Sequence, residues 1–206
     1  MENLTEKDID HIKQLIFSDT PELAFEMISG WDKSLIRQHL EIECTLFPLL
    51  CLQYFPFLLE GYAKFNLEAR QIKALPAQIG ELKFLDHLML QDNTLDELPE
   101  ELGQIEYLKH LNLSFNYFEI FPEVIAMLKN LRTLNMEHND LSNISDNIGH
   151  LTQLVSLNLN DNKITHLPDS IMNLSQLKSL EIMNNPIPEE EVGLLKTRLP
   201  HCDIQY

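Results

Sequence analysis

Three histidines are the side chains of this sequence with the clearest potential for chemistry. His87 and His110 are 23 residues apart, and His138 follows 28 residues later. Two neighbouring imidazoles could hold a metal ion if a carboxylate such as Asp92 or Glu137 supplied a third ligand. The sequence fixes no such third ligand, and two ligands fall short of the usual count. We therefore expect no metal site and no bound cofactor, and we interpret the histidines as part of a binding surface.

Motifs for catalysis and cofactor binding are absent from the sequence. It contains no G-x-S-x-G, P-loop, G-x-G-x-x-G or H-E-x-x-H motif, which would supply a nucleophile, a phosphate cradle or a pair of metal ligands. The cysteines, Cys44, Cys51 and Cys202, have neither metal-ligand nor redox-motif spacing, as is typical of free thiols in a reducing compartment. We expect a protein without catalytic residues.

The charge balance argues against two classes of partner. The 206 residues include 32 Asp and Glu but 15 Lys and Arg, for a formal net charge of −17. Such a surface repels phosphate backbones and anionic lipids, so we expect no nucleic-acid binding. The apolar stretch 44–59 is interrupted by prolines and is too short to span a bilayer, so we expect no membrane insertion.

The beginning of the sequence bears on where the protein acts. Residues 1–8 are polar and acidic, unlike the start of a signal peptide. This favours a cytoplasmic location, and export by a route without a cleaved apolar signal is the alternative.

A repeat of 23 residues organises the chain from residue 62 onward. In a frame that starts at Tyr62, positions 1, 4, 6, 11, 14, 18 and 21 are apolar in all five full units, and positions 1, 4, 6 and 11 are apolar in the truncated sixth. Only 44% of the whole chain is apolar, so this pattern predicts one continuous core. Position 9 is asparagine in all units but the first, and these residues are Asn93, Asn116, Asn139, Asn162 and Asn185.

Each unit is expected to contain a short strand, a turn and a second, tighter segment. Positions 4 and 6 are apolar around one variable residue, which is the alternation of a β-strand. An asparagine amide at position 9 can donate to and accept from backbone groups. We therefore expect the stacked asparagines to form a ladder that satisfies the turn amides. Position 15, which is proline in all full units except the one with Ser145, fixes φ and starts a helical turn.

The consensus of one unit, L-x-x-L-x-L-x-x-N-x-L-x-x-L-P-x-x-I-x-x-L, resembles the leucine-rich repeat. Its length and its Leu-Pro step resemble the Ras-group and related bacterial leucine-rich repeat proteins. The resemblance implies an α/β fold: a right-handed solenoid with a parallel sheet on its concave face and short helical or 3-10 turns on its convex face. A solenoid exposes its core at both ends and needs caps. We expect an N-terminal helical cap at 1–61, the repeats at 62–187, and a C-terminal cap at 188–206 that contains a helix and has room for an edge strand.

Function in such a scaffold depends on the variable positions rather than on the leucines. Positions 3, 5, 7 and 8 are expected to face the concave side, as a polar surface with more acids than bases. A wide polar face suits a protein or peptide partner better than a small ligand, which needs a deep pocket. Phe115 is the one Phe, Tyr or Trp among these positions, and aromatic anchors within a polar rim are typical of interaction hot spots. The expected centre of the partner site is therefore His87, Met89, His110, Asn112, Phe115, Asn135, Glu137 and His138.

The sequence supports two functions. The first is a non-enzymatic protein-interaction module, which we expect to be a monomer. The alternative is a regulatory or inhibitory subunit that occludes the active site of a partner enzyme or GTPase, the GTPase being suggested by the Ras-group resemblance. Two further alternatives concern the site: a sheet that is merely solvated while residues 1–61 bind the partner, and a Phe115 side chain that shields the ladder.

Overall fold

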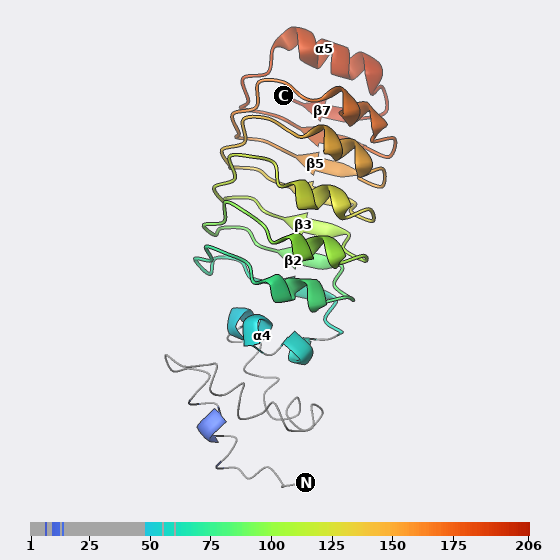
Figure 1. Cartoon of the computed structure of the whole chain (residues 1–206). Coiled ribbons are helices and arrows are strands. Elements are labelled where there is room, and N and C mark those ends of the chain that lie inside the picture. The colour runs from blue at the N-terminus through green and yellow to red at the C-terminus, as the bar shows by residue number, and fades with distance from the viewer. Residues whose placement is uncertain (1–6, 8–9, 13, 15–47, 55, 60) are drawn as a thin grey trace. The chain divides into compact units, whose positions relative to one another are not determined.

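The fold is taken from a computed structural model of the chain, which describes residues 7, 10–12, 14, 48–54, 56–59 and 61–206 (Figure 1). The chain divides into two compact units, Met1–Glu60 and Gly61–Tyr206. In the first unit, helix α4 spans Pro48–Tyr54 and the 3-10 helix η1 spans Pro56–Leu59. Most of the predicted N-terminal helical cap, 1–61, lies outside the described residues, so that boundary stays a prediction.

Seven short parallel strands form one sheet in the second unit, in chain order. The register advances by one whole repeat per strand, so that Leu88 faces Leu111 and Leu111 faces Leu134. This confirms the predicted solenoid with its parallel sheet. The strands are β1 (Lys64–Asn66), β2 (His87–Met89), β3 (His110–Asn112), β4 (Thr133–Asn135), β5 (Ser156–Asn158), β6 (Ser179–Glu181) and β7 (Asp203–Gln205).

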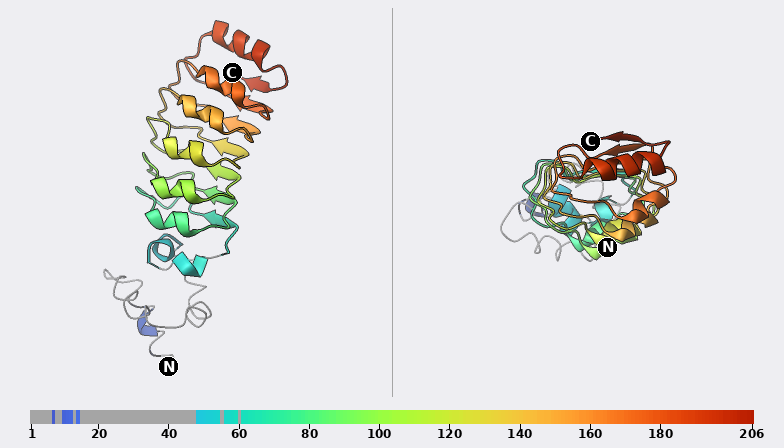
Figure 2. Two further views of the ribbon diagram at one scale, coloured as in Figure 1. Left: turned by 45° about the vertical axis from the view of Figure 1, so that its right-hand side comes forward. Right: turned by 90° about the horizontal axis from the view of Figure 1, so that it is seen from above.

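The chain returns from each of the strands β1 to β5 through a 3-10 helix on the opposite side of the array (Figure 2). Four of these helices follow a proline with φ between −64° and −69°. In the remaining helix, which begins at Asp146, Ser145 replaces the proline, and its Oγ accepts a hydrogen bond from the Asn147 N–H at 3.2 Å. The exception to the sequence pattern thus caps its helix by different chemistry. The helices are η2 (Ala77–Glu81), η3 (Glu100–Gln104), η4 (Glu123–Met127), η5 (Asp146–His150) and η6 (Asp169–Asn173).

The apolar positions of the repeat frame form the core between the sheet and the 3-10 helices. All of them are buried except Tyr62, Leu98 and Ile187, which are half-buried. Among the residues that the structure describes, Phe118 and Phe121 are the largest fully buried side chains. Because the leucine positions all face inward, the variable strand positions are left on the solvent side of the sheet, which we call the sheet face.

Helix α5 (Glu189–Arg198) and strand β7 close the last repeat. Three glutamates in the first turn of α5 and two basic residues in its last turn complement the helix dipole. The helix buries Val192 and Leu195, and Glu191 Oε1 accepts a hydrogen bond from the Leu167 N–H at 2.7 Å. Within the described part of the chain, no helix combines the length and apolarity needed to cross a bilayer.

Candidate partner-binding face

An asparagine ladder follows the carboxyl ends of the strands and holds each turn to its neighbours. Asn139 Nδ2 donates to the carbonyl oxygens of Leu113 at 3.0 Å and Met136 at 3.1 Å. Asn139 Oδ1 accepts a hydrogen bond from the Phe118 N–H at 3.1 Å. The same bonds recur at Asn93, Asn116, Asn162 and Asn185. Each amide therefore ties its own turn to the turn before it.

The residue immediately before each ladder asparagine has a left-handed backbone. Phe115 has φ of 55° and His138 has φ of 51°, a conformation that costs most for bulky side chains and least for Gly, Asn and Asp. Hydrogen bonds to the next turn hold it: the N–H of Phe115 donates to the carbonyl oxygen of Glu137 at 2.9 Å. We call these residues, together with Ala69 of the first unit of the repeat, the left-handed column; they are Ala69, Asp92, Phe115, His138, Asp161 and Asn184.

The strand residues of β2, β3 and β4 line a hollow of about 270 Å³ on the sheet face. His87 and His110 are register partners, and their rings stack with 4.1 Å between centroids. His87 Nδ1 donates to the Asp86 carboxylate, and His110 Nδ1 shares a hydrogen bond of 2.8 Å with Thr133 Oγ1. The other polar or flexible side chains of the lining are Met89, Asn112 and Asn135.

Two groups at this hollow have shifted pKa values. Partial removal from water, reinforced by the charge of a protonated His87, lowers the pKa of the His110 imidazole. The hydrogen bond from His87 lowers the pKa of the Asp86 carboxyl, and Lys109 acts in the same direction. At neutral pH the hollow is therefore lined by an uncharged His110, and the Asp86 carboxylate that bonds to His87 is ionised.

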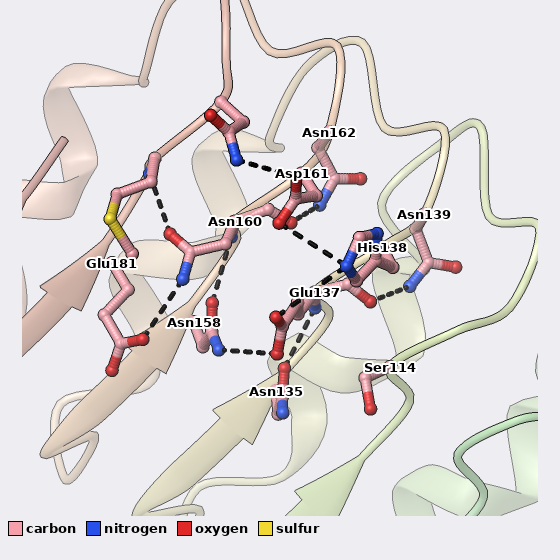
Figure 3. A network of polar contacts seen from close by, with 12 residues as sticks. Ser114, Asn135, Glu137, His138, Asn139, Asn158, Asn160, Asp161, Asn162 and Glu181 are labelled. Atoms are coloured by element: carbon pink, nitrogen blue, oxygen red, sulfur yellow. Dashed lines mark hydrogen bonds and ion pairs between the residues drawn. The ribbon is translucent and has the colours of Figure 1, made fainter.

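A second group of side chains lies just beyond the ends of β3, β4 and β5, as Figure 3 shows in part. The Phe115 ring stacks on the His138 imidazole with 4.4 Å between centroids, and Phe115 is 49% exposed. His138 Nε2 lies 3.6 Å from Asp161 Oδ2 and 4.0 Å from Glu137 Oε1. An aromatic ring, an imidazole and two carboxylates are thus gathered on neighbouring turns.

The structure places the eight residues of the predicted partner site in two adjoining groups on the sheet face. The Phe115 ring rests on His138, and half of the residue is exposed. The first group, around the hollow, is His87, Met89, His110, Asn112 and Asn135. The second, beyond the strand ends, is Phe115, Glu137 and His138.

Three residues of these groups were not singled out from the sequence. Asp86 directly precedes a histidine, Thr133 shares repeat position 3 with both stacked histidines, and Asp161 shares position 8 with His138. Because the sheet is in whole-repeat register, equal positions in adjacent units are spatial neighbours. The repeat frame could therefore have placed Thr133 beside His110 and Asp161 beside His138.

Comparisons with known proteins agree with this architecture. A sequence profile described as a leucine-rich repeat region matches residues 64–154, and another, described as leucine rich repeat, matches residues 129–187. Among curated proteins, no sequence matches the chain.

Two solved structures illustrate the likeness. An internalin from Listeria monocytogenes is 24% identical, with a TM-score of 0.56 over 66% of this chain and 38% of its own. A leucine-rich repeat protein of Leptospira interrogans is 26% identical, with a TM-score of 0.36 over 73% of this chain and 56% of its own. The present chain thus spans between about a third and a little over half of the length of these structures.

Proposed function

Because this chain is a leucine-rich repeat protein, we propose that it is a non-enzymatic protein-interaction module that binds its partner on the sheet face. The family and the fold imply interaction with proteins in general. The proposal adds the face, the residues and the kind of partner. The partner is a protein or peptide segment that contacts the hollow between β2 and β4 and the aromatic group beside it.

The observation that carries this proposal is the half-exposed aromatic ring of Phe115 on a largely polar face. A half-exposed phenylalanine on a polar face adds little to folding, and a left-handed backbone with φ of 55° costs about 1–2 kcal/mol for a side chain with a Cβ. The turn has this backbone in every repeat, even at Ala69, and asparagine or aspartate would tolerate it better, so the fold gives no reason for a phenylalanine here. Stacking on His138 keeps the ring in one place, so that less side-chain entropy is lost when a partner covers it.

The surroundings of Phe115 indicate the chemistry of the partner. The hollow offers amide groups, an uncharged imidazole and a methionine, which suit a polar peptide backbone and one apolar side chain. Three carboxylates lie beside this surface: Asp86 bonds to His87 of the hollow, and Glu137 and Asp161 lie next to His138. Charge complementarity therefore favours a neutral or basic partner segment over an acidic one.

A peptide-display selection against the immobilised chain tests the proposal, with peptides of random sequence standing in for the partner. We expect the selected peptides to carry no net negative charge. Against a selected peptide, Phe115→Ala should weaken binding by about 2 kcal/mol or more, which is roughly thirtyfold in Kd. Phe115→Asn should weaken it equally, since both variants remove the ring.

Phe84 provides the matched control. It is a phenylalanine that is 65% exposed, and it lies on the turn that leads from η2 into β2 rather than on a strand or in the left-handed column. Phe84→Ala should leave peptide binding within about twofold of the original chain, since scattered exposed apolar residues have no special role. Loss of binding in Phe84→Ala with full binding in Phe115→Ala would move the site off the sheet face.

A further inference from the structure

We propose, in contrast to the expectation from the sequence, that Glu137, His138 and Asp161 bind a divalent transition-metal ion of the zinc class on the sheet face. The proposal is independent of the protein partner, because it rests on the geometry of these three side chains alone. One ligand atom from each lies within 4.8 Å of the other two. All three are accessible, with 45% of the His138 side chain and 29% of each carboxylate side chain exposed.

The separations are close to those that a bound ion requires. Nitrogen and oxygen ligands lie about 2.1 Å from zinc, so two ligands of a tetrahedral site are about 3.4 Å apart. His138 Nε2 is 3.6 Å from Asp161 Oδ2 and 4.0 Å from Glu137 Oε1. Small rotations of these accessible side chains bring all three atoms to bonding distance.

The second oxygen of each carboxylate is held by an asparagine from a neighbouring turn. Asn158 Nδ2 donates to Glu137 Oε2 at 3.2 Å, and Asn184 Nδ2 donates to Asp161 Oδ1 at 2.8 Å. The oxygens that these amides do not contact, Oε1 and Oδ2, are the ones that face His138 Nε2 (Figure 3). Partners of this kind orient metal-binding carboxylates in known sites.

The backbone and the ring of His138 are also fixed. His138 and Asp161 both belong to the left-handed column, and each is followed by a ladder asparagine, Asn139 or Asn162, that is buried and bonded to two turns. The His138 ring stacks on Phe115. Ligands on such rigid turns need little ordering when an ion binds.

The ligand types select the class of ion. One imidazole nitrogen with two carboxylate oxygens suits zinc and similar transition-metal ions, whereas calcium takes six to eight oxygens and magnesium retains several waters. Three protein ligands leave further coordination positions open toward solvent.

Calorimetric titration of the full chain with zinc chloride at neutral pH tests the proposal. We expect one zinc ion per chain and no comparable heat with magnesium chloride. His138→Asn and Asp161→Asn should each weaken zinc binding about tenfold or more. Asparagine is chosen because Asn184 already occupies the same backbone conformation in a later turn, so both variants keep the fold.

His166→Asn is the control for adventitious binding to surface histidines, because His166 is exposed and lies outside the cluster. Its zinc affinity should stay within about twofold of the original chain. A crystal grown with zinc offers a measurement that needs no variant: an anomalous peak is expected between the three ligand atoms. Absence of zinc binding, or equal binding by His138→Asn and the original chain, would overturn the proposal.

Discussion

The ladder and the left-handed column run side by side through the same turns, yet they behave in opposite ways. Every ladder asparagine makes the same set of bonds to the backbone, and four of the five are buried. The column one residue earlier changes from alanine to aspartate, phenylalanine, histidine and asparagine with an almost constant φ of 51° to 57°. The ladder thus fixes the backbone so firmly that the adjacent side chain is free to vary.

This contrast separates stability from recognition over a distance of one residue. A ladder side chain faces inward and bonds to carbonyl oxygens, so its chemistry is dictated by the fold. A column side chain is exposed or half-buried, and its chemistry is accessible to a binding partner. The predictions below test that division at neighbouring residues.

The largest effect on stability is expected when an amide in the ladder is changed to a carboxylate, and the reverse change in the left-handed column is the comparison. In Asn162→Asp, a carboxylate oxygen replaces the Nδ2 that donates to the carbonyl oxygens of Met136, Leu159 and Asn160. We expect a loss of about 3 kcal/mol or more in the free energy of unfolding, because a buried group then faces acceptors without a donor. Asp161→Asn makes the reverse change one residue earlier and should stay within about 0.5 kcal/mol. Urea unfolding midpoints measure both, and similar midpoints would mean that the ladder bonds do not hold the turns.

A smaller effect should reveal the left-handed backbone itself. Phe115→Asn and Phe115→Val both remove the ring, but only asparagine tolerates positive φ. We expect the asparagine variant to be more stable by about 1 kcal/mol. On strand β4 the order should reverse: Thr133→Val should be more stable than Thr133→Asn, because β-branched valine favours an extended strand. Thermal unfolding midpoints of these four variants are the measurement. If Phe115→Val were more stable than Phe115→Asn, the left-handed backbone at residue 115 would be contradicted.

The smallest effect concerns pH and the hollow rather than the turns. The pKa of His110 is lowered in the folded chain. At pH values between this lowered pKa and the ordinary histidine pKa, the folded state therefore binds fewer protons than the unfolded state. Stability should therefore fall as pH drops through about 6.5 and level off below the folded-state pKa. His110→Thr, which copies Thr133 of the next strand, should reduce this fall. Denaturant midpoints at about pH 7.5 and about pH 5.5, on either side of the ordinary histidine pKa, test it. An unchanged difference between the two pH values would show that His110 does not contribute.

The repeat frame predicted the fold because its apolar positions have one physical requirement, burial, that any leucine or isoleucine meets. It also marked position 9, since an amide is the side chain that can both donate and accept within a turn. Asp92, Asp161 and Asn184 at position 8 are residue types that tolerate a left-handed backbone, but Ala69 and Phe115 at the same position are not, so the frame did not indicate this backbone in every unit. Nor could it show that His138 turns toward Asp161, since the direction of an exposed imidazole depends on the groups that neighbouring turns place around it.

The whole-repeat register has a consequence for how such a chain can be redesigned or can diversify. Ser114, Phe115 and His138 occupy the repeat positions that Glu137, His138 and Asp161 occupy one turn later. The combined changes Ser114→Glu, Phe115→His and His138→Asp would therefore transpose the chelating trio by one turn, about 4.8 Å along the sheet. The location of a binding group on this protein is therefore set by its repeat unit and its position within that unit. Duplication of one unit of 23 residues would lengthen the sheet face by one strand and one turn and leave the existing strands and turns in place.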